Sequence, residues 1–112
     1  MTKDNLGFVA INYIECKEEY VEKFEYLFKT RAGAIDKLPG FRSMNVLRPN
    51  EKDDKYLIVS YWDNEQNFKD WTSSEAFIEG HKRGFEDLKL YKEKGLEPPM
   101  KSEFRTYRIL TS

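Results

Sequence analysis

The sequence predicts an α+β fold of the ferredoxin-like type, in which strand, helix, strand, strand, helices and strand follow one another in a single domain, residues 1–112. Two long stretches with helical periodicity separate short apolar or alternating segments that are typical of strands. Right-handed crossovers place both helical stretches on one face of a four-stranded antiparallel sheet. The strands carry apolar side chains on both faces, so we expect a second copy to cover the other face and complete a dimeric α+β barrel.

The first strand is expected at Phe8–Cys16. Both alternating sets of its side chains are largely apolar, so both faces of this strand should be covered. Asn12 is the polar residue in its middle. A buried carboxamide costs about 1–3 kcal/mol when its hydrogen bonds are not made. Asn12 therefore either pairs with the backbone or faces a cavity that a polar group enters.

A long amphipathic helix is expected from Glu18 to about Ile35. Its stripe consists of Tyr20, Phe24, Leu27, Phe28, Arg31 and Ile35. Pro39-Gly40 ends the connection that follows the helix. Phe41–Leu47 and Tyr56–Trp62 are then expected to form a hairpin, joined by the polar loop 48–54.

Two helices with a short polar break between them are expected after the hairpin. The first should start at Asp63, with Gln66 at the third position after it. Thr72 and Glu75 fit the S/T-x-x-E capping box, in which a hydroxyl and a carboxylate bind two free backbone N–H groups. The second helix should therefore begin near Ser73.

The chain after this break is expected to finish the fold. The second helix should continue to about Tyr91. Gly95 and Pro98-Pro99 mark a loop. Phe104–Leu110 is then expected to supply the last strand.

The only histidine, His81, lies on the apolar stripe of the second helix. Phe77, Phe85 and Leu88 share its helical phase, so the imidazole should point inward. Such a histidine is either a core residue whose nitrogens bond to backbone groups or a ligand of a metal or of haem iron. Trp71 precedes the break, so two helices at an angle can direct the indole and the imidazole into one space.

Composition and charge exclude several kinds of partner and site. The 19 basic and 20 acidic side chains leave a formal charge of −1, so neither nucleic acid nor an anionic membrane is expected as a partner. The lone Cys16 excludes an internal disulfide and fits a reducing cytosol, so we expect a cytoplasmic protein. No apolar run approaches the roughly 18 residues that span a bilayer, and residues 1–5 are too polar for a signal peptide. The sequence has no zinc-type cysteine and histidine cluster and no G-x-G-x-x-G motif.

The run Phe68-x-x-Trp71-x-x-Ser74-x-x-Phe77-x-x-x-His81 closely resembles the helical segment of the IsdG-type haem-degrading monooxygenases, a branch of the antibiotic biosynthesis monooxygenase superfamily. The working residues of that family are an asparagine, a tryptophan and a histidine. The match places them at Asn12, Trp71 and His81. The Leu-x-Gly-Phe turn at 38–41 also resembles the family's.

The resemblance implies a haem-degrading monooxygenase for which haem is both cofactor and substrate. In this hypothesis His81 is the axial ligand of the haem iron, Asn12 donates a hydrogen bond on the open side of the iron, and Trp71 presses the porphyrin out of plane. The porphyrin ring is then opened by dioxygen and iron is released.

Further residues are candidates for the haem pocket. Phe28, Phe77 and Phe85 are candidate walls, and the candidates for binding the haem propionates are Arg31, Lys82 and Arg83. The sequence has no flavin or nicotinamide motif. A separate reductase or a small reductant is therefore expected to supply the electrons.

Two other classes of function remain open from the sequence. A cofactor-independent monooxygenase that oxidises a polycyclic phenol would use Asn12 and Trp71 to position substrate and oxygen, and would give His81 no ligand role. A non-catalytic module would bind haem or a partner without turnover. The product of ring cleavage, the physiological reductase and the choice between iron acquisition and haem detoxification do not follow from the sequence.

Overall fold

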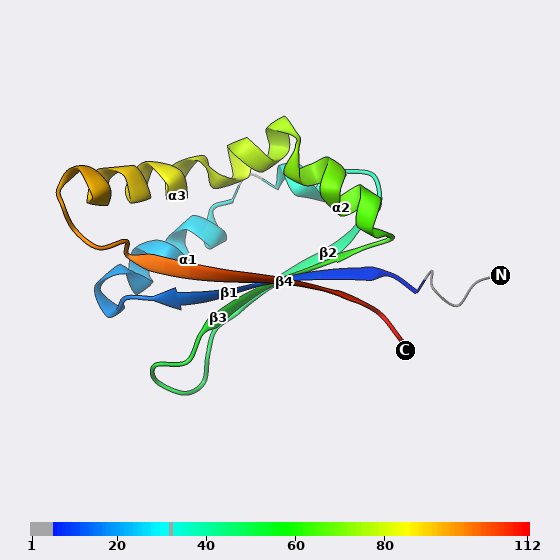
Figure 1. The fold of residues 1–112 in the computed structure, drawn as a ribbon, viewed down its shortest axis with the longest axis horizontal. Coiled ribbons are helices and arrows are strands. Elements are labelled where there is room, and N and C mark those ends of the chain that lie inside the picture. The colour runs from blue at the N-terminus through cyan, green and yellow to red at the C-terminus, as the bar shows by residue number, and fades with distance from the viewer. Residues whose placement is uncertain (1–5, 32) are drawn as a thin grey trace.

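The computed structural model describes residues 6–31 and 33–112; residues 1–5 and 32, which the predicted domain and first helix include, lie outside the described residues. One four-stranded sheet carries all the helices on one of its faces (Figure 1). The strand order is β2-β3-β1-β4, with every neighbouring pair antiparallel. This is the predicted ferredoxin-like arrangement.

Three strands have the predicted bounds and the fourth does not. The strands are β1 Phe8–Cys16, β2 Phe41–Leu47, β3 Tyr56–Trp62 and β4 Met100–Arg108. The prediction of β4 at Phe104–Leu110 is therefore wrong. β4 pairs with β1 along its whole length, from Met100 opposite Cys16 to Arg108 opposite Phe8, so this pairing fixes the ends of β4.

The predicted helix Glu18–Ile35 is in fact three shorter elements. They are the 3₁₀ helix η2 Glu18–Tyr20, α1 Val21–Lys29 and the 3₁₀ helix η3 Ala34–Lys37. The Thr30 hydroxyl donates to the carbonyl of Tyr26 at 2.7 Å and satisfies the last turn of α1. Gly33 then has φ +76°, a left-handed conformation that a helix cannot contain.

An asparagine and a serine cap the next two helices, and each helix begins later than predicted. α2, Glu65–Thr72, is capped by Asn64, whose side chain accepts from the N–H of Asn67 at 2.8 Å. α3, Glu75–Glu93, is capped by Ser74, whose hydroxyl accepts from the N–H of Phe77 at 3.3 Å. Asparagine and serine are both among the residues preferred at a helix N-cap.

The two residues predicted as caps, Asp63 and Thr72, bind other groups. Asp63 accepts from Arg42 at 2.8 Å, and the hydroxyl of Thr72 donates to the carbonyl of Lys69 at 2.8 Å. Asp63 therefore tethers β2, and Thr72 ends α2 instead of starting α3.

The core lies between the sheet and the helices as two clusters. One contains Phe8, Ala10, Ile35, Trp62 and Phe68; the other contains Ile14, Tyr20, Phe24 and Tyr56. Side chains alternate along a strand, so residues 8, 10, 12 and 14 of β1 share the helix-side face. Asn12 consequently lies between the two clusters, at a point where the apolar core is interrupted.

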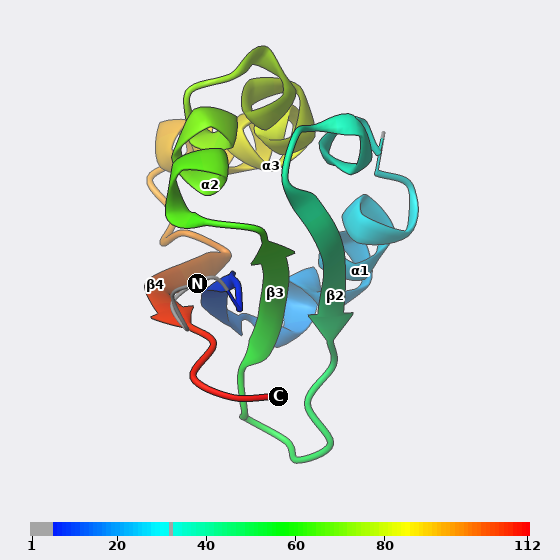
Figure 2. The same ribbon diagram turned by 90° about the vertical axis from the view of Figure 1, so that its right-hand side faces the viewer.

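The opposite face of the sheet carries no helix in the described part of the chain (Figure 2). The register places on it Val9, Ile11, Tyr13, Leu57, Val59 and Tyr61. This is the apolar face for which we predicted a second copy. Among the described residues, no helix combines the length and apolar composition that crossing a membrane requires.

Candidate active site

The three predicted site residues come from three different elements: Asn12 from β1, Trp71 from α2 and His81 from α3. The break between α2 and α3 fixes the last two. At this break the N–H and the hydroxyl of Ser74 both donate to the carbonyl of Trp71, at 2.9 and 2.6 Å. The ring centroids of Trp71 and His81 lie 5.9 Å apart as a result.

His81 is held between two phenyl rings of its own helix. Phe77 and Phe85 lie one turn before and after it and stack on the imidazole, with centroid distances of 4.1 and 5.5 Å. Its Nδ1 donates to the carbonyl of Phe77 at 2.7 Å, since a carbonyl only accepts. In the neutral ring the lone pair is then on Nε2. A backbone bond of this kind typically orients histidines that bind metals.

Two polar atoms of the site are buried without a partner. Among the described residues, the buried side-chain atoms that lack a hydrogen bond are Oδ1 of Asn12 and Nε1 of Trp71. Trp62 shows the usual situation, because its indole N–H donates to the hydroxyl of Ser60 at 3.0 Å. More than nine in ten buried polar groups are paired in this way. The unpaired atoms are therefore the ones a polar or metal-bearing ligand would meet, and they fit a haem site.

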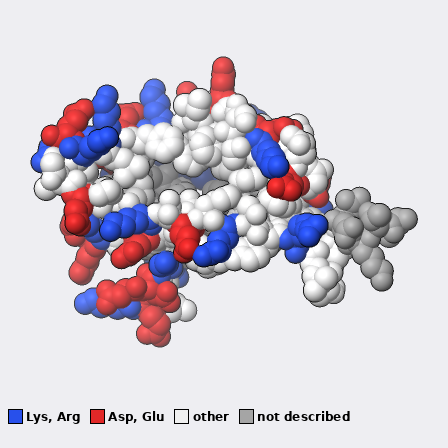
Figure 3. All heavy atoms as spheres, in the orientation of Figure 1, with Lys and Arg blue, Asp and Glu red and all other residues white. Residues whose placement is uncertain are grey.

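α3 leaves apolar side chains uncovered beside these residues. None of its residues is buried, and Ile78 and Phe85 are 62% and 50% exposed. Figure 3 shows a hollow between α3 above and β4 below, bordered largely by uncharged atoms. His81 is only partly buried, so its ring is not enclosed by packed core side chains.

α3 is anchored at its other side, on α1. The guanidinium of Arg83 donates to the hydroxyl and carbonyl of Thr30 and to the carbonyl of Leu27, at 2.8, 3.1 and 2.9 Å. Asp87 accepts from the hydroxyl of Tyr20 at 2.6 Å, and burial followed by this bond raises the pKa of that tyrosine. Arg83, a candidate for binding the haem propionates, is thus hydrogen-bonded to the end of α1 in this structure.

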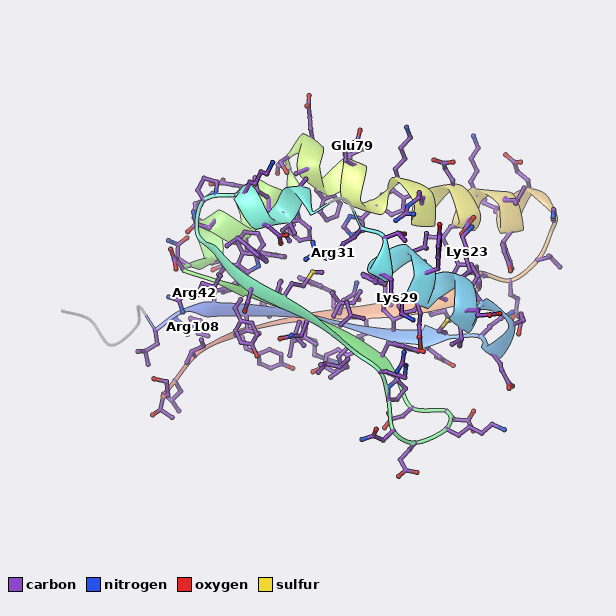
Figure 4. The ribbon with its side chains drawn as sticks, turned by 180° about the vertical axis from the view of Figure 1, so that it is seen from behind. Lys23, Lys29, Arg31, Arg42, Glu79 and Arg108 are labelled. Carbon is purple, nitrogen blue, oxygen red and sulfur yellow. The ribbon has the colours of Figure 1, made fainter. Side chains whose placement is uncertain are left out.

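The other predicted pocket residues, Phe28 and Arg31, have partners outside α3. Phe28 packs on Phe24 with ring centroids 5.0 Å apart, beside the second core cluster. Arg31 pairs with Asp36 at 3.3 Å, and its side chain points from the connection after α1 toward the space between helices and sheet (Figure 4). Phe77 and Phe85 are the predicted walls that contact His81.

Several known proteins are similar in sequence. A heme oxygenase (staphylobilin-producing) of Staphylococcus saprophyticus is 40% identical over 76 residues, which cover 66% of this chain and 72% of the relative. A heme oxygenase (mycobilin-producing) of Mycobacterium tuberculosis is 32% identical over 68 residues, covering 61% and 65%. The heme-degrading monooxygenase HmoA of Bacillus subtilis is 31% identical over 77 residues, covering 67% and 70%.

Solved structures confirm the fold. MhuD of M. tuberculosis, with two hemes bound in its active site, has a TM-score of 0.68 at 22% identity and covers 94% of this chain and 97% of its own. SnoaB of Streptomyces nogalater, a cofactor-independent oxygenase, has a TM-score of 0.67 at 19% identity and covers 95% of each chain. The model of the family named Antibiotic biosynthesis monooxygenase matches residues 7–83, and the resemblance inferred from the sequence is thus confirmed. Because the match spans more than half of its residues, the chain belongs to the antibiotic biosynthesis monooxygenase family.

Proposed function

We propose that the chain is a haem-degrading monooxygenase, which opens the porphyrin ring with dioxygen and electrons from an external donor. One observation carries the proposal: in the part of the chain that the structure describes, the two buried polar side-chain atoms without a partner are Oδ1 of Asn12 and Nε1 of Trp71, which belong to the same predicted site as the oriented His81. The sequence relatives named heme oxygenase or heme-degrading monooxygenase support it.

When bound, haem supplies a redox-active iron and is itself the molecule that is degraded. His81 would hold the haem iron through Nε2, and the bond from its Nδ1–H to the carbonyl of Phe77 keeps the tautomer in which Nε2 carries the lone pair. The rings of Phe77 and Phe85 hold the plane of the imidazole.

Asn12 and Trp71 contribute a hydrogen-bonding group and a rigid surface to the proposed site. Asn12 offers a carboxamide between the two core clusters, and its Nδ2–H would donate a hydrogen bond to developing negative charge there. Trp71 packs on Trp62 and Phe68, with centroids 5.6 and 5.9 Å away, so its indole is a rigid surface. Trp71 would therefore present a fixed apolar face to a bound porphyrin.

The partners and compartment in the proposal follow from surface and composition. A second copy covers the apolar sheet face opposite the helices, and sedimentation of a stable monomer at micromolar concentration would contradict this. A separate reductase or small reductant supplies the electrons. The lone Cys16, which is not in a disulfide, is consistent with the cytoplasm.

Haemin titration followed by turnover tests the function. Wild-type protein should give a stoichiometric Soret shift, and the Soret band should disappear on addition of ascorbate with catalase present. His81→Ala should weaken haemin binding and abolish turnover, whereas Asn12→Ala and Trp71→Ala should bind haemin and fail to degrade it. Tyr26→Ala, at a ring on α1 that is 57% exposed, is the control and should behave as wild type.

Each failure has a distinct meaning. No Soret shift in the wild type would favour a cofactor-independent oxygenase, the alternative that gives His81 no ligand role. A Soret band that persists under reductant would leave a non-catalytic haem-binding module. Wild-type affinity in His81→Ala would overturn the assignment of the iron ligand.

A further inference from the structure

Phe104 on β4 lies on the same side of the sheet as the site. It is paired in register with Asn12, so both side chains point toward the helices. β4 lies outside residues 7–83, the part of the chain that the family model matches. A single sequence predicts Phe104 only as the start of a strand, because it does not show the register between strands.

The ring of Phe104 is supported on one side and uncovered on the other. It stacks on Phe68 with a centroid distance of 5.5 Å and an interplanar angle of 13°. Phe68 is buried and contacts Phe8 and Trp71 at 5.5 and 5.9 Å, so it is a fixed support. Phe104 itself remains 52% exposed.

α2 covers one face of this ring through Phe68, and about half of the Phe104 side chain stays exposed although it is on the helix side of the sheet. α3 is held toward α1 by Arg83, and it buries none of its own residues. Phe85, on the same helix as His81, is likewise half exposed. Phe85 and Phe104 thus both leave about half of their side chains exposed, on α3 and β4, the two elements that border the hollow in Figure 3, and exposed aromatic rings beside an apolar hollow favour a flat apolar ligand.

We propose that Phe104 is a binding residue for the porphyrin, whose uncovered ring face contacts the apolar macrocycle and makes the site selective for flat aromatic ligands. The inference rests on the proposed function and adds to it a determinant from β4. Its contribution is independent of iron, because an aromatic contact acts on the ring system and not on the metal.

Two ligands separate this contact from iron ligation: haemin and iron-free protoporphyrin IX, titrated by absorbance and by quenching of protein fluorescence. Phe104→Leu keeps apolar volume and removes the planar face, so it should weaken both ligands by about tenfold. Phe104→Trp should retain wild-type affinity. His81→Ala should weaken haemin much more than protoporphyrin. Tyr26→Leu, at an exposed ring of α1, is the matched control and should change neither.

The outcomes distinguish this inference from the function on which it rests. Wild-type affinity of Phe104→Leu for both porphyrins, in a protein that binds haemin normally, overturns the role of Phe104 and leaves the proposed function intact. A wild type that binds neither porphyrin overturns both. Thermal unfolding of each variant is measured as well, and equal loss of affinity in Phe104→Leu and Phe104→Trp at unchanged melting temperature would also count against stacking.

Discussion

Replacing Asn12 by leucine should stabilise the ligand-free protein while abolishing ring opening. Leucine has nearly the shape of asparagine and no polar atoms, so the substitution removes a carboxamide whose Oδ1 is buried without a partner. An unsatisfied buried group costs about 1–3 kcal/mol. Leucine would also join the helix-side row of Ala10 and Ile14, which belong to the two core clusters. We therefore expect the free energy of unfolding to rise by about 1–2 kcal/mol.

Urea denaturation measures this change at one fixed protein concentration, because association would make the stability depend on concentration. Ser60→Ala is the control, for which we expect the free energy of unfolding to fall. Ser60 is buried on β3 and accepts from the indole N–H of Trp62, so alanine leaves that N–H unpaired and should lower stability by about 1–3 kcal/mol. Asn12→Leu at or below wild-type stability would show that the carboxamide is satisfied in solution, and the argument from unpaired atoms would be refuted.

Two further predictions concern parts of the fold away from the site. Gly40→Ala should lower the free energy of unfolding by about 2 kcal/mol or more, because Gly40 has φ +76° and an added Cβ would overlap the side chain of Asn67. Gly80→Ala, where an added Cβ would meet nothing within 4 Å, should raise it by up to about 1 kcal/mol. Urea denaturation measures both changes, and equal effects would contradict the geometry. Hydrogen bonds from Arg48 and from the hydroxyl of Tyr56 lower the pKa of Glu25 to about 2. Its stabilisation is therefore present above the ordinary carboxyl pKa of about 4.3 and is lost as the pH falls from about 5 to 2. Glu25→Gln should flatten the pH dependence of the urea midpoint in that window. If the midpoint of the variant still falls with pH as in the wild type, the bonds to Glu25 are not the cause of that fall.

The hairpin shows what a single sequence can determine. Phe41–Leu47 and Tyr56–Trp62 have the predicted bounds, because alternating side chains and a polar loop are local signals. Helix caps are less certain, since several polar residues compete within a few positions. Asn64 and Ser74 cap the helices, whereas Asp63 and Thr72 bind other groups. That choice depends on contacts outside the local sequence.

The candidate site was predictable where helical phase determines it. The inward direction of His81 and the break after Trp71 follow from periodicity and from polar residues, and both agree with the structure. The unpaired atoms, the anchoring bonds of Arg83 and the place of Phe104 depend on register and on packing between elements. For Phe104 the signal would have been its pairing with Asn12, which needs the bounds of β4.

The residues of the candidate site lie where the core of the chain is interrupted and where apolar side chains stay exposed. Asn12 interrupts the core between its two clusters, and α3 has no buried residue among those that the structure describes. A ligand that covers Phe85 and Phe104 would remove apolar surface that the chain alone leaves in water. Binding at this site is therefore coupled to stability, and porphyrin should raise the melting temperature with ligand concentration as a native-state ligand does. The coupling gives a reason why a stabilising substitution such as Asn12→Leu would be excluded by function.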